Sequence, residues 1–185
     1  LAYTGHTIFR SNYQGDVGLH VAKCLYVYTQ KPDEEKKNLK TLEEKAAYLQ
    51  ICYQEGSALY DADPEAKSGI DQLNKAIYNR DAVISEVWEE TRGWCVEYYK
   101  KFEERLGTTY DRYYYESETS QPGIDLVKKH TGDIFEESEG ATVFKGEKYG
   151  LHTRVFLTKN DTPTYEAKDI GLIKLKSEEW PFDQA

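Results

Sequence analysis

A tyrosine and an aspartate four positions apart could together bind a flat cation. They are Tyr165 and Asp169, in the stretch TPTYEAKDIGLIKLK from Thr162 to Lys176. On a helix, residues four apart lie on one face. A phenol ring attracts a cation over its π face, and a carboxylate accepts two parallel N–H bonds from a guanidinium. The pair therefore suits a guanidinium ligand. The alternative interpretation is a half-buried aromatic residue beside a helix-start charge.

The helix that would position this pair is expected to begin after Pro163 and Thr164. Asp169 would then lie in or near the first turn, where the backbone N–H groups favour an anion. A wide buried stripe is expected on the same helix from its apolar residues, which are Ile170, Leu172, Ile173 and Leu175. We therefore expect a phenol and a carboxylate to project together from a helix start that is anchored in a core.

The length and composition indicate one large domain, or one domain with an insertion. The chain has 185 residues, of which 39% are hydrophobic and 14% aromatic, enough to bury a core. Acidic residues outnumber basic ones, 33 against 24, for a net charge of −9. This charge argues against DNA binding and against a general nucleic-acid surface, and it suits a small cationic ligand.

The sequence predicts a cytoplasmic protein with no membrane partner. No apolar run is long enough to cross a bilayer, and no signal peptide opens the chain. Cys24, Cys52 and Cys95 are far apart and odd in number, so we expect them to be buried, reduced thiols.

The first thirty residues predict a strand, a glycine turn and a helix, which is the opening half of a βαβ unit. The strand is expected at Thr7–Tyr13, Gly15 and Gly18 allow the turn, and Asp16 could cap a helix that opens near Val17. Ligands bind such sheets where a strand gives way to a helix. That rule places four polar residues near any site: Asn12, Gln14, Asp16 and His20.

A helical block is predicted in the middle of the chain, after a charged linker at Lys31–Asn38. Thr41 and Glu44 form a capping-box pattern that opens a helix through Tyr60. Asp63 and Pro64 open the next helix, to about Asn79, and Asp81 opens the longest, to Leu106. The expected division is residues 1–30 for the first part of the main domain, 31–107 for linker and inserted helices, and 108–185 for the return to that domain.

Strands are expected to return after the helical block. Thr109–Glu118 is strand-like, and Pro122-Gly123 predicts a turn before a short helix at Ile124–His130. Ala141–Phe144 and Leu151–Leu157 alternate like the two strands of a hairpin. The predicted fold class is therefore α/β with an inserted helical block.

Several kinds of chemistry have no support in the sequence. The four histidines and three cysteines lack metal-ligand spacing, so no metal site is expected. Neither a GxSxG nucleophile elbow nor a Walker A loop is present. The paired carboxylates Glu136 and Glu137 are expected to be a solvated acidic loop. Composition and spacing alone lead no further than an α/β domain with a helical insertion.

Three stretches resemble class I arginyl-tRNA synthetases of the archaeal-like variety. They are NYQGDVGLHVAK at Asn12–Lys23, LGTTYDRYYYESE at Leu106–Glu118, and Ala141–Leu172. The helical block falls where that family has its connective insertion. The resemblance implies a partial Rossmann-like catalytic domain of an enzyme that uses ATP with Mg²⁺ to activate arginine and transfers it to tRNA(Arg).

The resemblance also implies roles for particular residues. In that family the tyrosine of a Tyr-x-x-x-Asp motif packs on the substrate and the aspartate holds its guanidinium, and these positions match Tyr165 and Asp169. A Gly-Asp-x-Gly loop matches Gly15, Asp16 and Gly18. With Asn12 and His20 beside them, these residues form a candidate active-site loop.

The chain departs from the family where ATP would bind. The His-x-Gly-His signature belongs a helix upstream of NYQGD, and Gly5-His6 lies too close to Gly15 to match it. The Lys-Met-Ser-Lys signature needs a methionine, and there is none. We therefore expect the middle of a catalytic domain, inactive by itself, with both ATP signatures outside it and its catalytic residues unknown.

Two other hypotheses remain open. One is a non-catalytic module that holds arginine or a protein partner. The other is a different class I synthetase, although an uncharged amino acid would have no use for Asp169 beside Tyr165.

Overall fold

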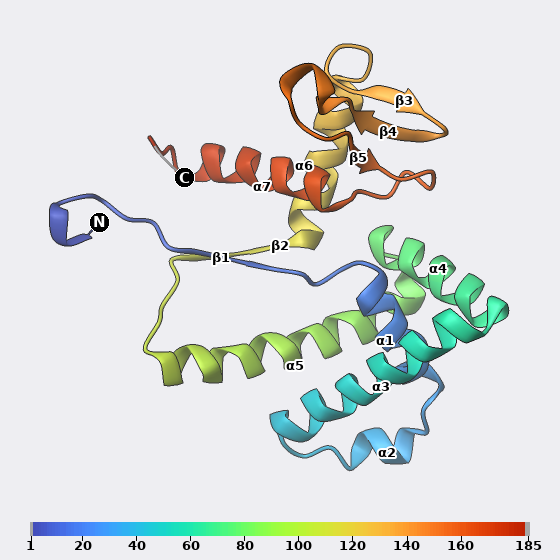
Figure 1. Ribbon diagram of the computed structural model, residues 1–185. Helices are drawn as coiled ribbons and strands as arrows, with labels where there is room; N and C mark the ends of the chain where they lie inside the picture. Colours follow the sequence, from blue (N-terminus) through green and yellow to red (C-terminus); the bar gives the residue numbers. More distant parts are fainter. Residues whose placement is uncertain (1, 184–185) are drawn as a thin grey trace. The chain divides into compact units, whose positions relative to one another are not determined.

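The computed structural model describes residues 2–183, and Figure 1 shows their helices and strands in chain order. These residues form two compact units. One contains the residues up to Gly15 together with those from Tyr110 onwards, and the other is Asp16–Thr109. Helices and strands mix in the first unit, so the predicted α/β class is confirmed.

The second unit is helical. Its elements are α1 (Leu19–Gln30), α2 (Asp33–Lys37), α3 (Leu42–Ala62), α4 (Pro64–Tyr78) and α5 (Ala82–Leu106). The caps of α3 and α4 are those that the sequence predicts. Thr41 Oγ1 accepts from the Glu44 N–H at 3.1 Å while the Glu44 carboxylate accepts from the Thr41 N–H at 2.9 Å. Asp63 caps α4 by accepting from the Glu65 N–H at 2.8 Å.

Packing of α1 against its neighbours fills the core of this unit. One buried cluster is Val17, Ala22, Leu25, Ile70, Ile77, Ile84 and Trp88. A second is Val27, Tyr28, Leu49 and Cys52, with Cys24 and Cys95 packed against it. All three cysteines are free thiols, but only Cys52 is fully buried. The expected linker at residues 31–38 is partly wrong, because it contains the short helix α2.

The mixed unit contains two small sheets. β1 (Ser11–Gln14) and β2 (Arg112–Tyr115) pair in parallel, with Asn12 opposite Tyr113 and Gln14 opposite Tyr115. Both strands are shorter than predicted. β3 (Glu136–Ser138), β4 (Ala141–Phe144) and β5 (Arg154–Leu157) form an antiparallel sheet, and the bounds of β4 are as predicted. Single 3₁₀ turns lie at Ala2–Thr4 and Gly146–Tyr149.

The predictions of an acidic loop at Glu136 and of a turn at Pro122 are wrong. Glu136 is in β3, and its carboxylate lies 2.7 Å from Lys145 Nζ. Pro122 lies inside α6 (Glu116–Lys129). A proline within a helix costs about 3 kcal/mol, so the packing of the buried residues Thr119, Gly123 and Val127 must outweigh that cost.

That packing brings α6 against α7 (Tyr165–Glu179) at backbone distance, as the two adjacent helices in Figure 1 illustrate. A Cβ atom on Gly123 would lie 2.0 Å from the Ala167 carbonyl oxygen. One on Gly171 would lie 2.1 Å from the Thr119 carbonyl oxygen. Neither position can therefore hold a side chain, because the backbone of the other helix lies too close.

The same contact explains why the expected buried stripe on α7 is partly wrong. The buried residues of α7 are Ala167, Lys168, Gly171 and Leu172. Ile173, which was expected in the stripe, is 56% exposed. At such a short distance α6 accepts small residues on the facing helix surface and leaves no room for a row of large aliphatic side chains.

The glycine contact predicts opposite effects for two identical substitutions. Gly171→Ala should lower the free energy of unfolding by about 1–3 kcal/mol, because the methyl group meets backbone that cannot give way. Gly93→Ala should raise it by about 0.5–1 kcal/mol, because Gly93 lies in α5 with nothing within 4 Å of a new Cβ. Urea unfolding of both variants, followed by circular dichroism, measures these changes. Equal effects of the same sign would contradict the close approach of α6 and α7.

Candidate functional site

The carboxyl ends of β1 and β2 bring Gly15 and Glu116, the first residue of α6, together. Because Gln14 pairs with Tyr115 in a parallel sheet, the next residues, Gly15 and Glu116, leave the sheet at the same edge. The Glu116 carboxyl carbon lies 3.5 Å from the place that a Cβ on Gly15 would occupy. Open α/β sheets bind their ligands at this edge. It is therefore the first place in this unit to look for a site.

A buried ion pair joins this edge to α7. Lys168 Nζ lies 2.5 Å from Glu116 Oε2, and the two side chains are only 5% and 6% exposed. The same ammonium lies 4.6 Å from the centroid of the Tyr165 ring. Lys168 therefore connects the carboxylate at the end of β2 with one half of the predicted guanidinium pair.

Tyr165 and Asp169 both lie at the surface of α7. Tyr165 is its first residue and is 65% exposed, and Asp169 follows one turn later, also exposed. Asp169 is thus just beyond the first turn, where the acidic residue is Glu166. The start of the helix is fixed to β5, because the Thr164 hydroxyl donates to the Val155 carbonyl at 2.7 Å. The predicted anchored helix start with an outward phenol and carboxylate is present.

The five residues of the candidate active-site loop divide between the two units. Asn12, half-buried within β1, and Gly15 belong to the mixed unit. Asp16, Gly18 and His20 belong to the helical unit. Gly18, with a φ of +115°, precedes α1, and His20 is exposed in its first turn. Whether these three residues reach the ligand of Tyr165 and Asp169 stays a prediction.

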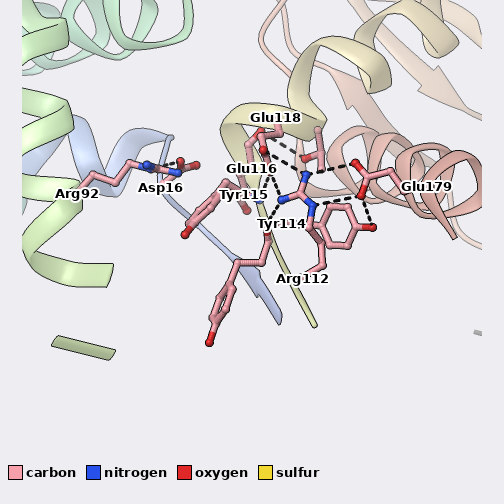
Figure 2. Close-up of polar contacts among 10 residues, drawn as sticks. Asp16, Arg92, Arg112, Tyr114, Tyr115, Glu116, Glu118 and Glu179 are labelled. Carbon is pink, nitrogen blue, oxygen red and sulfur yellow. Dashed lines mark hydrogen bonds and ion pairs between the residues drawn. The ribbon is translucent and has the colours of Figure 1, made fainter. Parts of the chain in front are cut away.

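The expectation that Asp16 caps α1 is wrong. The cap position is Gly18, and the Asp16 carboxylate instead lies 2.6 Å from Arg92 Nε of α5 (Figure 2). The Asp16 carbonyl also accepts from the Trp88 indole N–H at 2.7 Å. Asp16 is 7% exposed. The free-energy cost of burying its charge is therefore offset by the ion pair with Arg92 and not by the backbone N–H groups at the start of α1.

An arginine that lies between two glutamates links β2 to the C-terminal end of α7. Figure 2 shows Arg112 pointing between Glu118 and Glu179. Its Nε and Nη2 lie 3.2 and 3.3 Å from the two oxygens of Glu179, and its guanidinium lies 4.4 Å from the ring centroid of Tyr114. The Tyr114 hydroxyl donates to Glu179 at 2.9 Å.

These contacts shift the pKa values of the cluster in opposite directions. Burial, and then the bond to Glu179, raises the pKa of Tyr114 to about 12, so its hydroxyl remains a donor. The hydrogen bond from Arg112 lowers the pKa of Glu179. The guanidinium of Arg112, held by carboxylates over a tyrosine ring, has the surroundings predicted above for an arginine ligand.

Glu116 and Lys168 were not predicted from the sequence. The strand-to-helix rule that selected Asn12 and Asp16 applies equally at the end of β2 and could have found Glu116. Lys168 gave no signal, because a lysine three positions after Tyr165 is expected to extend into water.

No helix within residues 2–183 is long and apolar enough to span a membrane. In the part of the chain that the structure describes, no three His, Cys, Asp or Glu side chains are grouped so that they could hold a metal ion.

Comparisons with known proteins agree on one family. The family model described as tRNA synthetases class I (R), catalytic domain, matches residues 1–185. A protein of Bdellovibrio bacteriovorus named arginine–tRNA ligase is 30% identical, and one of Treponema denticola with the same name is 27% identical. Each alignment covers 100% of this chain and 32% of the relative, so the chain spans about a third of the length of these relatives.

A solved structure is similar in fold. The crystal structure of arginyl-tRNA synthetase from Plasmodium falciparum superimposes with a TM-score of 0.61 over 91% of this chain and 27% of that one, at 18% identity. An archaeal relative, from Methanopyrus kandleri, is 24% identical over 92% of this chain. Because bacterial and archaeal proteins both match, the expected archaeal-like variety stays a prediction.

The cluster around Arg112 predicts a stability effect that depends on pH. A carboxyl with a lowered folded-state pKa stabilises the fold above its unfolded-state pKa, near 4.5, and this contribution is lost as the pH falls through the lower folded value. Glu179→Gln should therefore reduce the free energy of unfolding at pH 7 by about 0.5–1 kcal/mol, since the side chain is 40% exposed. The difference from the parent should shrink as the pH falls below 4.5.

The neighbouring Glu178→Gln is the matched control, because Glu178 pairs with Lys174 on its own helix and not with a distant strand among residues 2–183. Urea unfolding at a series of pH values measures both variants. A Glu179→Gln effect that stays constant from pH 7 to pH 3 would show that the Arg112 contact does not stabilise this unit.

Proposed function

The chain belongs to the catalytic-domain family of class I arginyl-tRNA synthetases, and on that premise we propose that it is the central part of an enzyme that activates arginine with ATP and transfers it to tRNA(Arg). One observation supports the substrate most directly. Tyr165 and Asp169 are exposed one turn apart at the start of α7, next to the carboxyl edge of a parallel sheet.

In this proposal the two side chains bind the substrate's guanidinium. The Asp169 carboxylate accepts two parallel N–H bonds, and the exposed face of the Tyr165 ring stacks on the planar cation. A lysine substrate has a point charge and can use neither the bidentate geometry nor flat stacking. The pair would therefore select arginine over lysine as well as bind it.

Other parts of the proposal rest on the family. The loop with Asn12, Gly15, Asp16, Gly18 and His20 would border the reacting end of arginine. Residues 31–107 would be the connective insertion between the parts of the catalytic domain at 1–30 and 108–185. ATP would come with Mg²⁺, and no ATP signature occurs in these 185 residues, so the groups that neutralise its phosphates would belong to other parts of the full-length protein.

Asp169→Asn tests the binding role directly, because it keeps the shape of the side chain and removes its charge. A charge-assisted hydrogen bond is worth about 1.5–3 kcal/mol, so the Kd of arginine should rise roughly ten- to a hundredfold. The Kd of ATP should hardly change. Isothermal titration calorimetry on the full-length protein that contains this chain measures both constants.

Asp125→Asn is a suitable control, since Asp125 is an exposed aspartate on α6 whose bond from Gln121 an asparagine can still accept. It should leave both Kd values unchanged. If Asp169→Asn lowers only the melting temperature and arginine binds as before, Asp169 is merely a charge near the start of a helix.

A further test concerns the 185 residues expressed alone. We expect no arginine-dependent exchange of pyrophosphate into ATP, because the phosphate-neutralising groups are missing. The full-length protein should perform this exchange. Exchange by the isolated chain would contradict the proposed location of the ATP site. Arginine binding by the full-length protein without any exchange would instead support the alternative of a non-catalytic arginine-binding module.

A further inference from the structure

The position of Lys168 is not accounted for by the proposed arginine site. Its side chain is 5% exposed, and lysines are almost never that buried unless they are paired. The ammonium lies 2.5 Å from Glu116 Oε2 and 4.6 Å from the Tyr165 ring centroid. It therefore contacts at once the carboxylate at the end of β2 and the aromatic ring that is proposed to stack on the substrate.

Stability alone does not explain this lysine. A buried ion pair gains about as much from Coulomb attraction as it loses by desolvation, so an apolar side chain of similar volume would stabilise the helix contact equally well. The backbone fit of Gly123 and Gly171 already holds α6 and α7 together. The charge of Lys168 therefore acts mainly on the two groups that it contacts, the Glu116 carboxylate and the Tyr165 ring.

The effect on Tyr165 follows from the geometry of the ring. Tyr165 is the first residue of α7 and is 65% exposed, so few packed neighbours restrict its rotamer. A fixed ammonium against one face of the ring favours the orientation that keeps that face over the charge. A ring held in one orientation loses less entropy when a substrate stacks on it, which strengthens binding.

The charge of Lys168 could also repel a second cation from the same ring. The Glu116 carboxylate at 2.5 Å offsets that charge, so the pair is close to neutral when seen from the substrate side. The pair can therefore orient the ring without excluding a guanidinium from its exposed part.

We propose that Lys168 is a positioning residue for arginine recognition: paired with Glu116, it fixes the Tyr165 ring so that the substrate guanidinium meets a preoriented aromatic surface. This inference rests on the proposed function, since it presumes that Tyr165 stacks on arginine. It adds a residue that acts through Tyr165 and does not touch the substrate.

The decisive variant is Lys168→Met, which keeps an unbranched stem and removes the charge. In the full-length protein it should raise the Kd of arginine roughly three- to tenfold, the range expected from a partly buried cation–π contact. The Kd of ATP should not change. Lys168→Arg should recover most of the arginine affinity, because it restores a cation over the ring.

Two controls separate positioning from general damage. Lys174→Met removes a lysine from the same helix that pairs with Glu178, and it should not affect arginine binding. Leu49→Ala removes a side chain that is 7% exposed in the core of the helical unit. It should lower the melting temperature at least as much as Lys168→Met while leaving the Kd of arginine unchanged.

A double-mutant cycle gives the sharpest readout and does not depend on Lys168→Arg folding. If Lys168 acts through Tyr165, adding Lys168→Met to Tyr165→Ala should cause no further loss of arginine affinity. Additive losses would overturn the proposal, as would an unchanged Kd for Lys168→Met alone. If Tyr165→Ala itself binds arginine normally, the proposed function fails at its own site, which is a different result from failure of the positioning role.

Discussion

The approach of α6 and α7 to backbone distance is the constraint on which the mixed unit depends. Gly123 faces the Ala167 carbonyl and Gly171 faces the Thr119 carbonyl, each with no room for a side chain. Between the two helices lies the buried pair of Glu116 and Lys168. A proline within α6 is tolerated because this contact outweighs its cost, and the large aliphatic residues of α7 cannot all turn inward because the space is already taken.

The candidate site is a consequence of this packing. Once the small face of α7 is turned to α6, Tyr165 and Asp169 must face outward near the end of β2, where Glu116 leaves the sheet. The first turn is fixed to β5 through Thr164, and the far end is fixed to β2 through Glu179 and Arg112. The helix that presents the exposed pair is thus held at both ends, which is the rigidity that a recognition site requires.

Local signals in the sequence predicted much of the fold, and contacts between distant residues account for what was missed. The helix starts at Thr41 and Asp63 were predictable because each cap is a hydrogen bond between residues that lie within four positions of one another. The run of α6 through Pro122 was not, because it depends on a helix more than forty residues away. Asp16 was assigned to the nearest helix end, whereas its partner Arg92 is 76 positions away. Within the candidate site the exposed pair was predicted from its spacing, but Lys168 was not, because only the fold shows that this lysine points inward.

The central claim is that the Asp169 carboxylate recognises the positive charge of the arginine side chain. The most direct measurement compares, by calorimetry on the full-length protein, the Kd of arginine with that of citrulline, in which a neutral urea group replaces the guanidinium. Citrulline should bind at least about tenfold more weakly than arginine, and Asp169→Asn should remove most of this difference. A preference for arginine that is equally large in the parent protein and in Asp169→Asn would contradict recognition of the charge by Asp169.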